Sequence, residues 1–255
     1  MKKVRNLLLL AVILYIPIRS NAWGVVGHKL VAKIAYTQIS PAVKDSLKYY
    51  LEQTTIEEAS VWMDEIKADA SNDSLKPFHY FDMDKGEKYN PDSTNNIIGE
   101  LNRVIRELKD RGKYSKEHIA VDIKILIHLV GDLHQPLHTG YKNDKGGNAI
   151  SVFFAANGSN LHRVWDTDIL EGYILNEPTT WASTSKYSKE ELAAIKKTDV
   201  VGWMNESRSK LDIVYDFTGQ DISGKYIKLA VPVIEERLLF GGLRLGKLLH
   251  DIFRA

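Results

Sequence analysis

Three histidines and one aspartate lie within eleven residues of this sequence, from His128 to His138. His128 and Asp132 are four residues apart, so on a helix their side chains share one face, one turn apart. Such a pair can bind one hard or borderline metal ion, as in H-E-x-x-H sites. Pro136 ends the helix, because it has no N–H and restricts the residue before it, and it can present His138 from a new direction. A buried helix with a few satisfied polar residues is the alternative interpretation.

A second histidine and aspartate are also four residues apart. His162 and Asp166, within N-L-H-R-V-W-D, can again offer one nitrogen and one carboxylate to the same ion. Other polar or N-terminal residues are weaker candidates when each is taken singly: Trp23, His28, Asp64, Lys67 and His79. His118 and His250 lack partners of this kind, and we interpret both as surface or helix-end residues.

The first 22 residues have the pattern of a secretory signal peptide. A basic start, Met1–Arg5, precedes an almost entirely apolar run over 7–18, and 20–22 has small residues at its first and third positions. The apolar run is short for a membrane span, which needs about 20 residues. We expect cleavage after Ala22, with Trp23 as the mature N-terminus; a retained signal anchor is the alternative.

Cleavage would leave 233 residues, enough for one large domain with a substantial core. The leader carries four of the 34 basic residues and none of the 33 acidic ones, so the mature chain has a formal charge of −3. This balance gives no basic footprint for tight binding of duplex DNA. The chain has no cysteine, so an exported form must be held by its core or by metals. Three N-x-S/T sequons matter only in a host that glycosylates: Asn72, Asn157 and Asn205.

Apolar periodicity predicts a single, mainly α-helical domain. We expect helices over 23–39, 40–52, 55–68, 93–109, the segment after 115–118, 160–170, 189–197, 202–215 and 222–253. The pattern breaks between Asp69 and Tyr89, where 78–82 is expected to be extended or looped. Turn residues at 143–147 precede 149–154, which we expect to form one strand of a small β-hairpin.

Taken together, these motifs resemble the S1/P1 nuclease family. Its members are secreted zinc-dependent nucleases that share a helical fold with bacterial zinc-dependent phospholipase C. The resemblance spans nearly the whole mature chain, as a catalytic domain over 23–255. It is carried by Trp23 with His28, Trp62-Met-Asp64, Phe78-His79-Tyr80, and the segments 131–138, 144–148 and 160–166.

The resemblance implies three zinc ions per chain. The first would be held by Asp64, His79, His128 and Asp132. The second would be held by His138, His162 and Asp166. The third would be bound by the free α-amino nitrogen and the carbonyl oxygen of Trp23, with His28 and a shared Asp132. On this interpretation His134 is not a ligand.

The resemblance also implies roles for residues around the ions. Asp64, Lys67 and Asp82 would be catalytic, with Asp82 as the carboxylate that positions the basic Lys67. Tyr80, Asp144 and Asn148 would line a nucleobase pocket. A base stacked on Tyr80 must be unpaired, because pairing hides its face and its edge.

The implied enzyme is a hydrolase that uses metal-activated hydroxide. It would cut phosphodiester bonds of single-stranded RNA and DNA to 5′-phosphorylated products, with 3′-nucleotidase activity as well. We expect a monomer without a stable protein partner or a membrane span in the mature chain, exported to the periplasm or the medium.

Two departures from the better-known fungal and plant members keep alternatives open. Their disulfides are absent, and the mature chain is short, so loops that affect substrate range are expected to be trimmed. A phospholipase C-like phosphodiesterase is the nearest alternative, although those enzymes carry glutamate at the position of Asp166. A zinc-binding export protein without activity is the third. A structural zinc site needs four closed ligands, whereas this chain offers nine residues around open positions.

Overall fold

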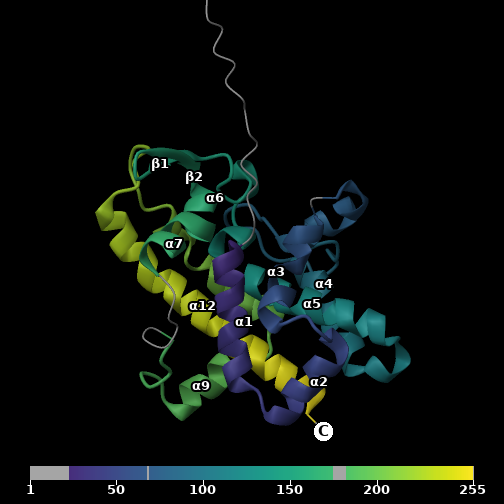
Figure 1. The fold of residues 1–255 in the computed structure, drawn as a ribbon. Helices are drawn as coiled ribbons and strands as arrows, with labels where there is room; N and C mark the ends of the chain where they lie inside the picture. The colour runs from purple at the N-terminus through teal and green to yellow at the C-terminus, as the bar shows by residue number, and fades with distance from the viewer. Residues whose placement is uncertain (1–22, 68, 175–181, 255) are drawn as a thin grey trace, which may run out of the picture.

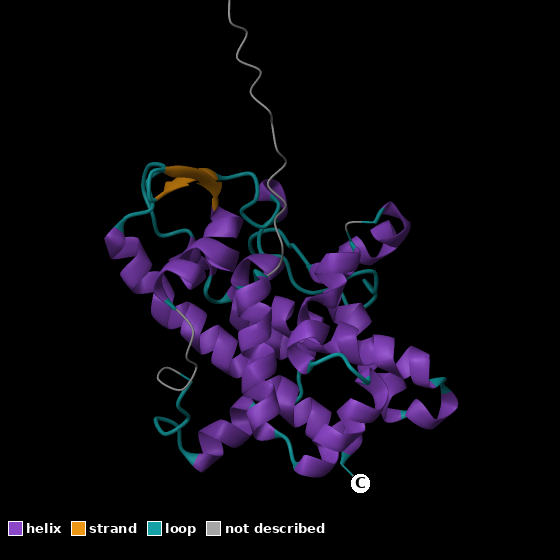
Figure 2. Ribbon diagram, in the orientation of Figure 1, coloured by secondary structure: helices purple, strands orange, loops and turns teal. Residues whose placement is uncertain are grey.

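The computed structural model describes residues 23–67, 69–174 and 182–254, and the expected signal peptide and its cleavage site lie outside these ranges. The described chain is mainly α-helical, with one two-stranded sheet, as the sequence predicts (Figures 1 and 2). None of the described helices is both long enough and apolar enough to cross a membrane.

The α-helices are α1 (Val25–Gln38), α2 (Pro41–Leu51), α3 (Ile56–Ile66), α4 (Ile97–Lys109), α5 (Lys116–Leu133), α6 (Leu161–Arg163), α7 (Ile169–Tyr173), α9 (Lys189–Ile195), α10 (Val200–Arg208), α11 (Leu211–Val214) and α12 (Gly224–Phe253). Short 3₁₀ helices are η1 (Ala70–His79), η2 (Arg111–Lys113), η3 (Pro136–Thr139) and η4 (Lys142–Asp144). A π-helical turn, η5 (Val164–Asp168), lies between α6 and α7.

Helix α5 lies at the centre of the bundle. It packs against α3 and α4 and also contacts α1 and α12, while α1 packs along α12 (Figure 1). Every residue from Ile125 to Leu133 is buried, so this half of α5 has no solvent face. The polar side chains of His128 and Asp132 are therefore enclosed on all sides by other elements.

The starts of several helices follow directly from capping residues. Ser40, Thr55 and Ser115 each accept a hydrogen bond from a backbone N–H of the first turn, which satisfies a donor that the helix leaves free. Helix α4 begins later than predicted, because Asn96 caps it through the N–H groups of Ile98 and Gly99.

Helix α5 ends at Leu133, just before Pro136, as the sequence predicts. The chain then forms the short η3 helix, which carries His138. Two further elements differ from those that the sequence predicts. The segment 70–79, expected to lack regular structure, is the 3₁₀ helix η1, and the expected helix over 202–215 consists of α10 and α11 with a break at 209–210.

The expected hairpin consists of strands β1 (Ser151–Phe154) and β2 (Asn157–Asn160). The strands are antiparallel, and Ser151 pairs with Asn160. The π-helical turn that follows interrupts the helical pattern expected over 160–170. Such turns often occur at functional sites, and this one carries Asp166.

Helices α1 and α5 approach each other closely at Gly131. A Cβ atom at this position would lie 2.8 Å from Nδ1 of the His28 ring. We expect Gly131→Ala to push the His28 ring out of place and to lower the free energy of unfolding by about 1–3 kcal/mol. Gly112→Ala is the matched control, because no atom lies within 4 Å of its added Cβ. Equal thermal midpoints for the two variants would contradict this account of the helix contact.

Candidate metal centre

Four predicted ligands from three elements meet around the carboxylate of Asp132. Its Oδ2 lies 3.0 Å from His79 Nδ1 and 3.2 Å from His128 Nε2. Asp64 Oδ1 lies 3.9 Å from His79 Nδ1 and 3.8 Å from His128 Nε2. All four side chains are almost fully buried. Helix α5 supplies two of them on one face, α3 supplies Asp64, and the end of η1 supplies His79.

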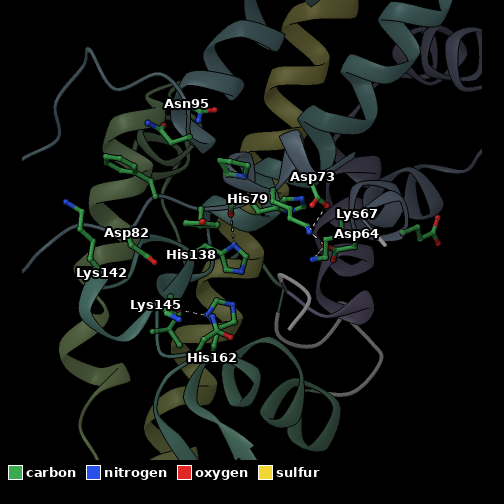
Figure 3. A pocket seen from close by; sticks show the side chains of 18 of the residues that line it. Asp64, Lys67, Asp73, His79, Asp82, Asn95, His138, Lys142, Lys145 and His162 are labelled. Atoms are coloured by element: carbon green, nitrogen blue, oxygen red, sulfur yellow. Dashed lines mark hydrogen bonds and ion pairs between the residues drawn. The ribbon is translucent and has the colours of Figure 1, made fainter. Parts of the chain in front are cut away.

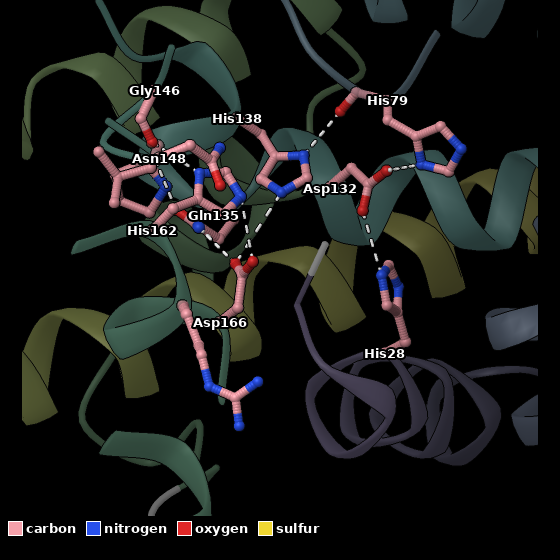
Figure 4. Close-up of polar contacts among 12 residues, drawn as sticks. His28, His79, Asp132, Gln135, His138, Gly146, Asn148, His162 and Asp166 are labelled. Carbon is pink, nitrogen blue, oxygen red and sulfur yellow. Dashed lines mark hydrogen bonds and ion pairs between the residues drawn. The ribbon is translucent and has the colours of Figure 1, made fainter. Parts of the chain in front are cut away.

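The other oxygen of Asp132 faces α1. His28 Nε2 lies 3.1 Å from Asp132 Oδ1, and the His28 ring stacks on His128 with centroids 4.0 Å apart. One carboxylate therefore connects two sets of histidines (Figure 4). Trp23, at the start of the described chain, is fully buried, and the next N–H, of Gly24, donates to the carbonyl of Asp166 at 2.8 Å.

A separate group contains His138, His162 and Asp166. His162 Nε2 lies 3.0 Å from Asp166 Oδ2, and His138 Nε2 lies 3.9 Å from Asp166 Oδ1. The amide of Gln135 donates to Asp166 Oδ1 at 2.5 Å. His138 lies on η3, His162 on α6 and Asp166 on η5. His162 and Asp166 lie on the other side of His138 from Asp132 (Figure 4).

Backbone carbonyls orient three of these rings. Nδ1 of His128, His138 and His162 lies 2.7, 2.7 and 2.6 Å from the carbonyls of Ser60, His79 and Gly146. A proton on Nδ1 leaves the Nε2 lone pair facing the centre, which is the usual arrangement of metal-binding histidine. His79 and His28 differ, because Nδ1 of His79 faces Asp132 and Nδ1 of His28 has no hydrogen-bond partner among the described residues.

The charges of the centre suit a cation. Burial alone would raise the pKa of Asp132, but the positive charge that His128 can carry and the hydrogen bond from its ring hold that pKa well below its usual range. Burial lowers the pKa of His138 to about 4. His138 is therefore neutral near pH 7, in the form that binds metals.

Buried polar atoms without a hydrogen bond indicate whether a metal ion would fit between these side chains. Among the described residues, His138 Nε2 is buried without a hydrogen-bond partner, and His28 Nε2 and Asp132 Oδ1 lie 3.1 Å apart without forming a hydrogen bond. Leaving such an atom unpaired costs about 1–3 kcal/mol. A cation between them would satisfy these atoms, and imidazole with carboxylate is a donor set suited to zinc. The residues present fit the expected metal.

A cavity of about 1170 Å³ opens beside these ligands. Asp64, His79, His138 and His162 form part of its wall, and Lys67, Tyr80, Asp82 and Asn148 line it as well (Figure 3). Tyr80 is 47% exposed, so its ring is accessible from solvent.

The expectation that Asp82 positions Lys67 is not met. Lys67 Nζ lies 2.5 Å from Asp64 Oδ1, three residues earlier, whereas Asp82 is on the opposite side of the cavity (Figure 3). The reason lies in the backbone, because the N–H groups of Phe81 and Met83 donate to the carbonyls of His138 and Gly140. This pairing directs Asp82 toward the loop that holds Asn148.

Asp144 also differs from its expected place in the base pocket. Its carboxylate accepts hydrogen bonds from the Gly147 N–H and the Tyr215 hydroxyl, both at 2.8 Å, and it does not line the cavity. Asp82 lines the cavity instead, and its Oδ1 is buried without a hydrogen-bond partner among the residues described. Burial, together with the charge of Asp144, raises the pKa of Asp82 to about 6.

Two residues have specific contacts that the sequence did not predict. Gln135 orients Asp166, and its only signal was its place beside Pro136 in the central motif. The interpretation of His118 as a residue without partners was wrong, because its ring lies 2.7 Å from Glu107 and 3.3 Å from Asp122. The four-residue spacing of His118 and Asp122 was the signal. His134 lies outside the centre, with its Nε2 2.8 Å from Arg244.

Comparisons with known proteins relate the chain to nucleases. The model of the family described as S1/P1 Nuclease matches residues 23–254. "Endonuclease 2" of Arabidopsis thaliana is 26% identical, with 94% of each chain covered. "Nuclease S1" of Aspergillus oryzae is 26% identical over 88% of this chain and 89% of the relative. "Nuclease P1" of Penicillium citrinum is 24% identical over 90% of this chain and 97% of the relative.

Among solved structures, the alpha toxin from Clostridium absonum has a similar fold, with a TM-score of 0.53 and 17% identity. The match covers 89% of this chain and 64% of the toxin. This likeness concerns the fold alone. The family match over nearly all of 23–255 decides the class: the chain belongs to the S1/P1 nuclease family, and it is a hydrolase that acts on the phosphodiester bonds of nucleic acids.

Proposed function

We propose that this nuclease is a zinc-dependent enzyme that cuts single-stranded RNA and DNA to 5′-phosphorylated products and also removes 3′-phosphates from nucleotides. The observation that carries the proposal is the buried Asp132 carboxylate between two sets of histidines, next to a cavity with an exposed tyrosine and several lysines.

Three ions would be held by the residues already described. The first would take Asp64, His79, His128 and Asp132, and the second His138, His162 and Asp166. The third would take His28, Asp132 and the α-amino nitrogen and carbonyl of Trp23. When bound, zinc would lower the pKa of a water molecule toward neutrality and offset negative charge on a phosphate.

The protein's own side chains would bind and orient the substrate. Lys67, held by Asp64, would place positive charge beside the phosphate, where negative charge increases in the transition state. Lys145 also lines the cavity and makes no ion pair within the described ranges, so its charge is available to a neighbouring phosphate. The other lysines of the wall, Lys76 and Lys142, are paired with carboxylates.

Single-strand preference would follow from the base pocket. Tyr80 offers an exposed ring for stacking, and Asp82 and Asn148 offer polar atoms for the edge of the base. We assign the edge contact to Asp82 rather than Asp144, because the Asp144 carboxylate is already bonded to Gly147 and Tyr215. A paired base can present neither its face nor its edge to such a pocket.

Export and a monomeric state complete the proposal. The basic start and apolar run of the first 22 residues support export, and cleavage after Ala22 would create the free amine of Trp23. Without a cleaved amine the third ion would lack one of its ligands.

A paired substrate assay tests the proposed activity. We expect the purified mature protein to cut single-stranded RNA and DNA faster than duplex DNA, and to lose this activity in a chelator and regain it with zinc. Activity on vesicles of phosphatidylcholine, with none on nucleic acid, would instead support the phospholipase-like alternative and overturn the proposal.

Asp82 provides a second test, because its buried carboxylate should cost stability. A raised pKa means that the folded state holds the proton more tightly, so the cost is absent below the ordinary pKa near 4 and complete above about 6. Asp82→Asn should therefore raise the free energy of unfolding by about 2–3 kcal/mol at pH 7 and by much less at pH 4. The same variant should raise KM for oligonucleotides.

Asp92→Asn is the control, since Asp92 is an exposed carboxylate that makes no ion pair among the described residues. It should change neither stability nor KM. An Asp82→Asn variant with wild-type stability at both pH values, measured by urea unfolding, would refute the assigned burial cost.

A further inference from the structure

A second group of ionisable residues lies between α4 and α5, away from the metal centre. Glu100, Arg103 and Glu107 lie on one face of α4, and His118 and Asp122 lie one turn apart near the start of α5. His118 precedes His128 by ten residues on the same helix, which is about 15 Å along its axis. The group is therefore separate from the centre around Asp132.

Arg103 organises the carboxylates of this group. Its Nη2 lies 2.6 Å from Glu100 Oε1 and 3.0 Å from Asp122 Oδ1, and its Nη1 lies 2.8 Å from Glu107 Oε2. Three carboxylates therefore share one guanidinium, and these four groups together have a formal charge of −2. That charge matches one divalent cation.

One oxygen of the Asp122 carboxylate lacks a hydrogen bond. This residue is 1% exposed, and its Oδ2 is buried and accepts no hydrogen bond within the part of the chain that the structure describes. Burial raises the pKa of Asp122 although Arg103 opposes the shift. A buried carboxylate oxygen without a donor is costly unless a cation lies beside it.

The ring of His118 lies at this oxygen. His118 Nε2 is 3.3 Å from Asp122 Oδ2 and 2.7 Å from Glu107 Oε2, and the ring stacks on Tyr114 with centroids 4.7 Å apart. A single proton on Nε2 can be donated to one of the two carboxylates at a time. A divalent ion in place of that proton could be bound by both carboxylates at once.

We propose that Glu107, His118 and Asp122 form a separate surface site for a divalent transition metal, with zinc as the best match. Zinc bonds of about 2.0–2.2 Å in tetrahedral geometry place neighbouring donor atoms about 3.3–3.6 Å apart. The three donor atoms all lie within 4.8 Å of one another. The side chain of His118 is 41% exposed, which leaves the fourth position open to water.

Such an ion would join α4 to α5 outside the metal centre. The chain has no cysteine, so no disulfide can connect these helices. An ion bound only by the folded state stabilises it in proportion to the logarithm of its concentration over Kd. The site therefore gives this chain a cross-link that depends on the supply of zinc.

The test compares His118→Gln with the wild-type protein. After equilibration with zinc chloride and removal of free metal, elemental analysis should find one zinc equivalent fewer in the variant. His250→Gln is the matched control, because His250 belongs to none of the potential ligand groups among the described residues. It should keep the wild-type content. Asp122→Asn, which removes the buried charge without removing the ring, should also lose one equivalent.

Nuclease activity is measured on the same samples and should be equal in wild type and His118→Gln. The proposal depends on the difference in zinc content between variants, so it can fail or succeed whatever the number of ions in the centre around Asp132. Equal zinc content in wild type, His118→Gln and Asp122→Asn would overturn it and leave the group as an ion-pair network around Arg103.

Discussion

The fully buried carboxylate of Asp132 is the constraint on which the site depends. A charge in this position is tolerated only if positive or polar partners surround it, because its transfer from water to the interior is very costly. His28, His79 and His128 provide partners on both of its oxygens. Helix α5 carries the carboxylate on its buried half, and α1 and α3 must pack tightly against α5 to bring Asp64 and His28 within reach.

The end of α5 creates the second part of the site. If the helix continued past Leu133, His138 would remain on its surface, but the η3 turn brings His138 beside His162 and Asp166. Carbonyls of the loops that follow fix the rings, so loop backbone and helix side chains form one unit. The glycine-rich segment near Asn148 serves this centre as well, because the carbonyl of Gly146 accepts from His162.

The sequence predicted those relations that depend on local spacing. The pairs His128/Asp132 and His162/Asp166 share helix turns, and the helix end before Pro136 follows from proline chemistry. Asp82 could not be placed in this way, because its position is set by backbone hydrogen bonds between 81–83 and 138–140, far apart in the chain. Asp144 was misplaced for a similar reason, since Tyr215 approaches it from another element. His118 and Asp122 had a recognisable spacing, but Glu107 joins them only through helix packing.

The shared carboxylate is the central claim, and anomalous diffraction at the zinc absorption edge tests it most directly. Crystals of the mature protein that begins at Trp23 should show a zinc peak bonded to each oxygen of Asp132, one also near His79 and His128 and the other near His28 and the Trp23 amine. A further peak should lie among His138, His162 and Asp166. A map in which Asp132 contacts one ion or none would contradict the account.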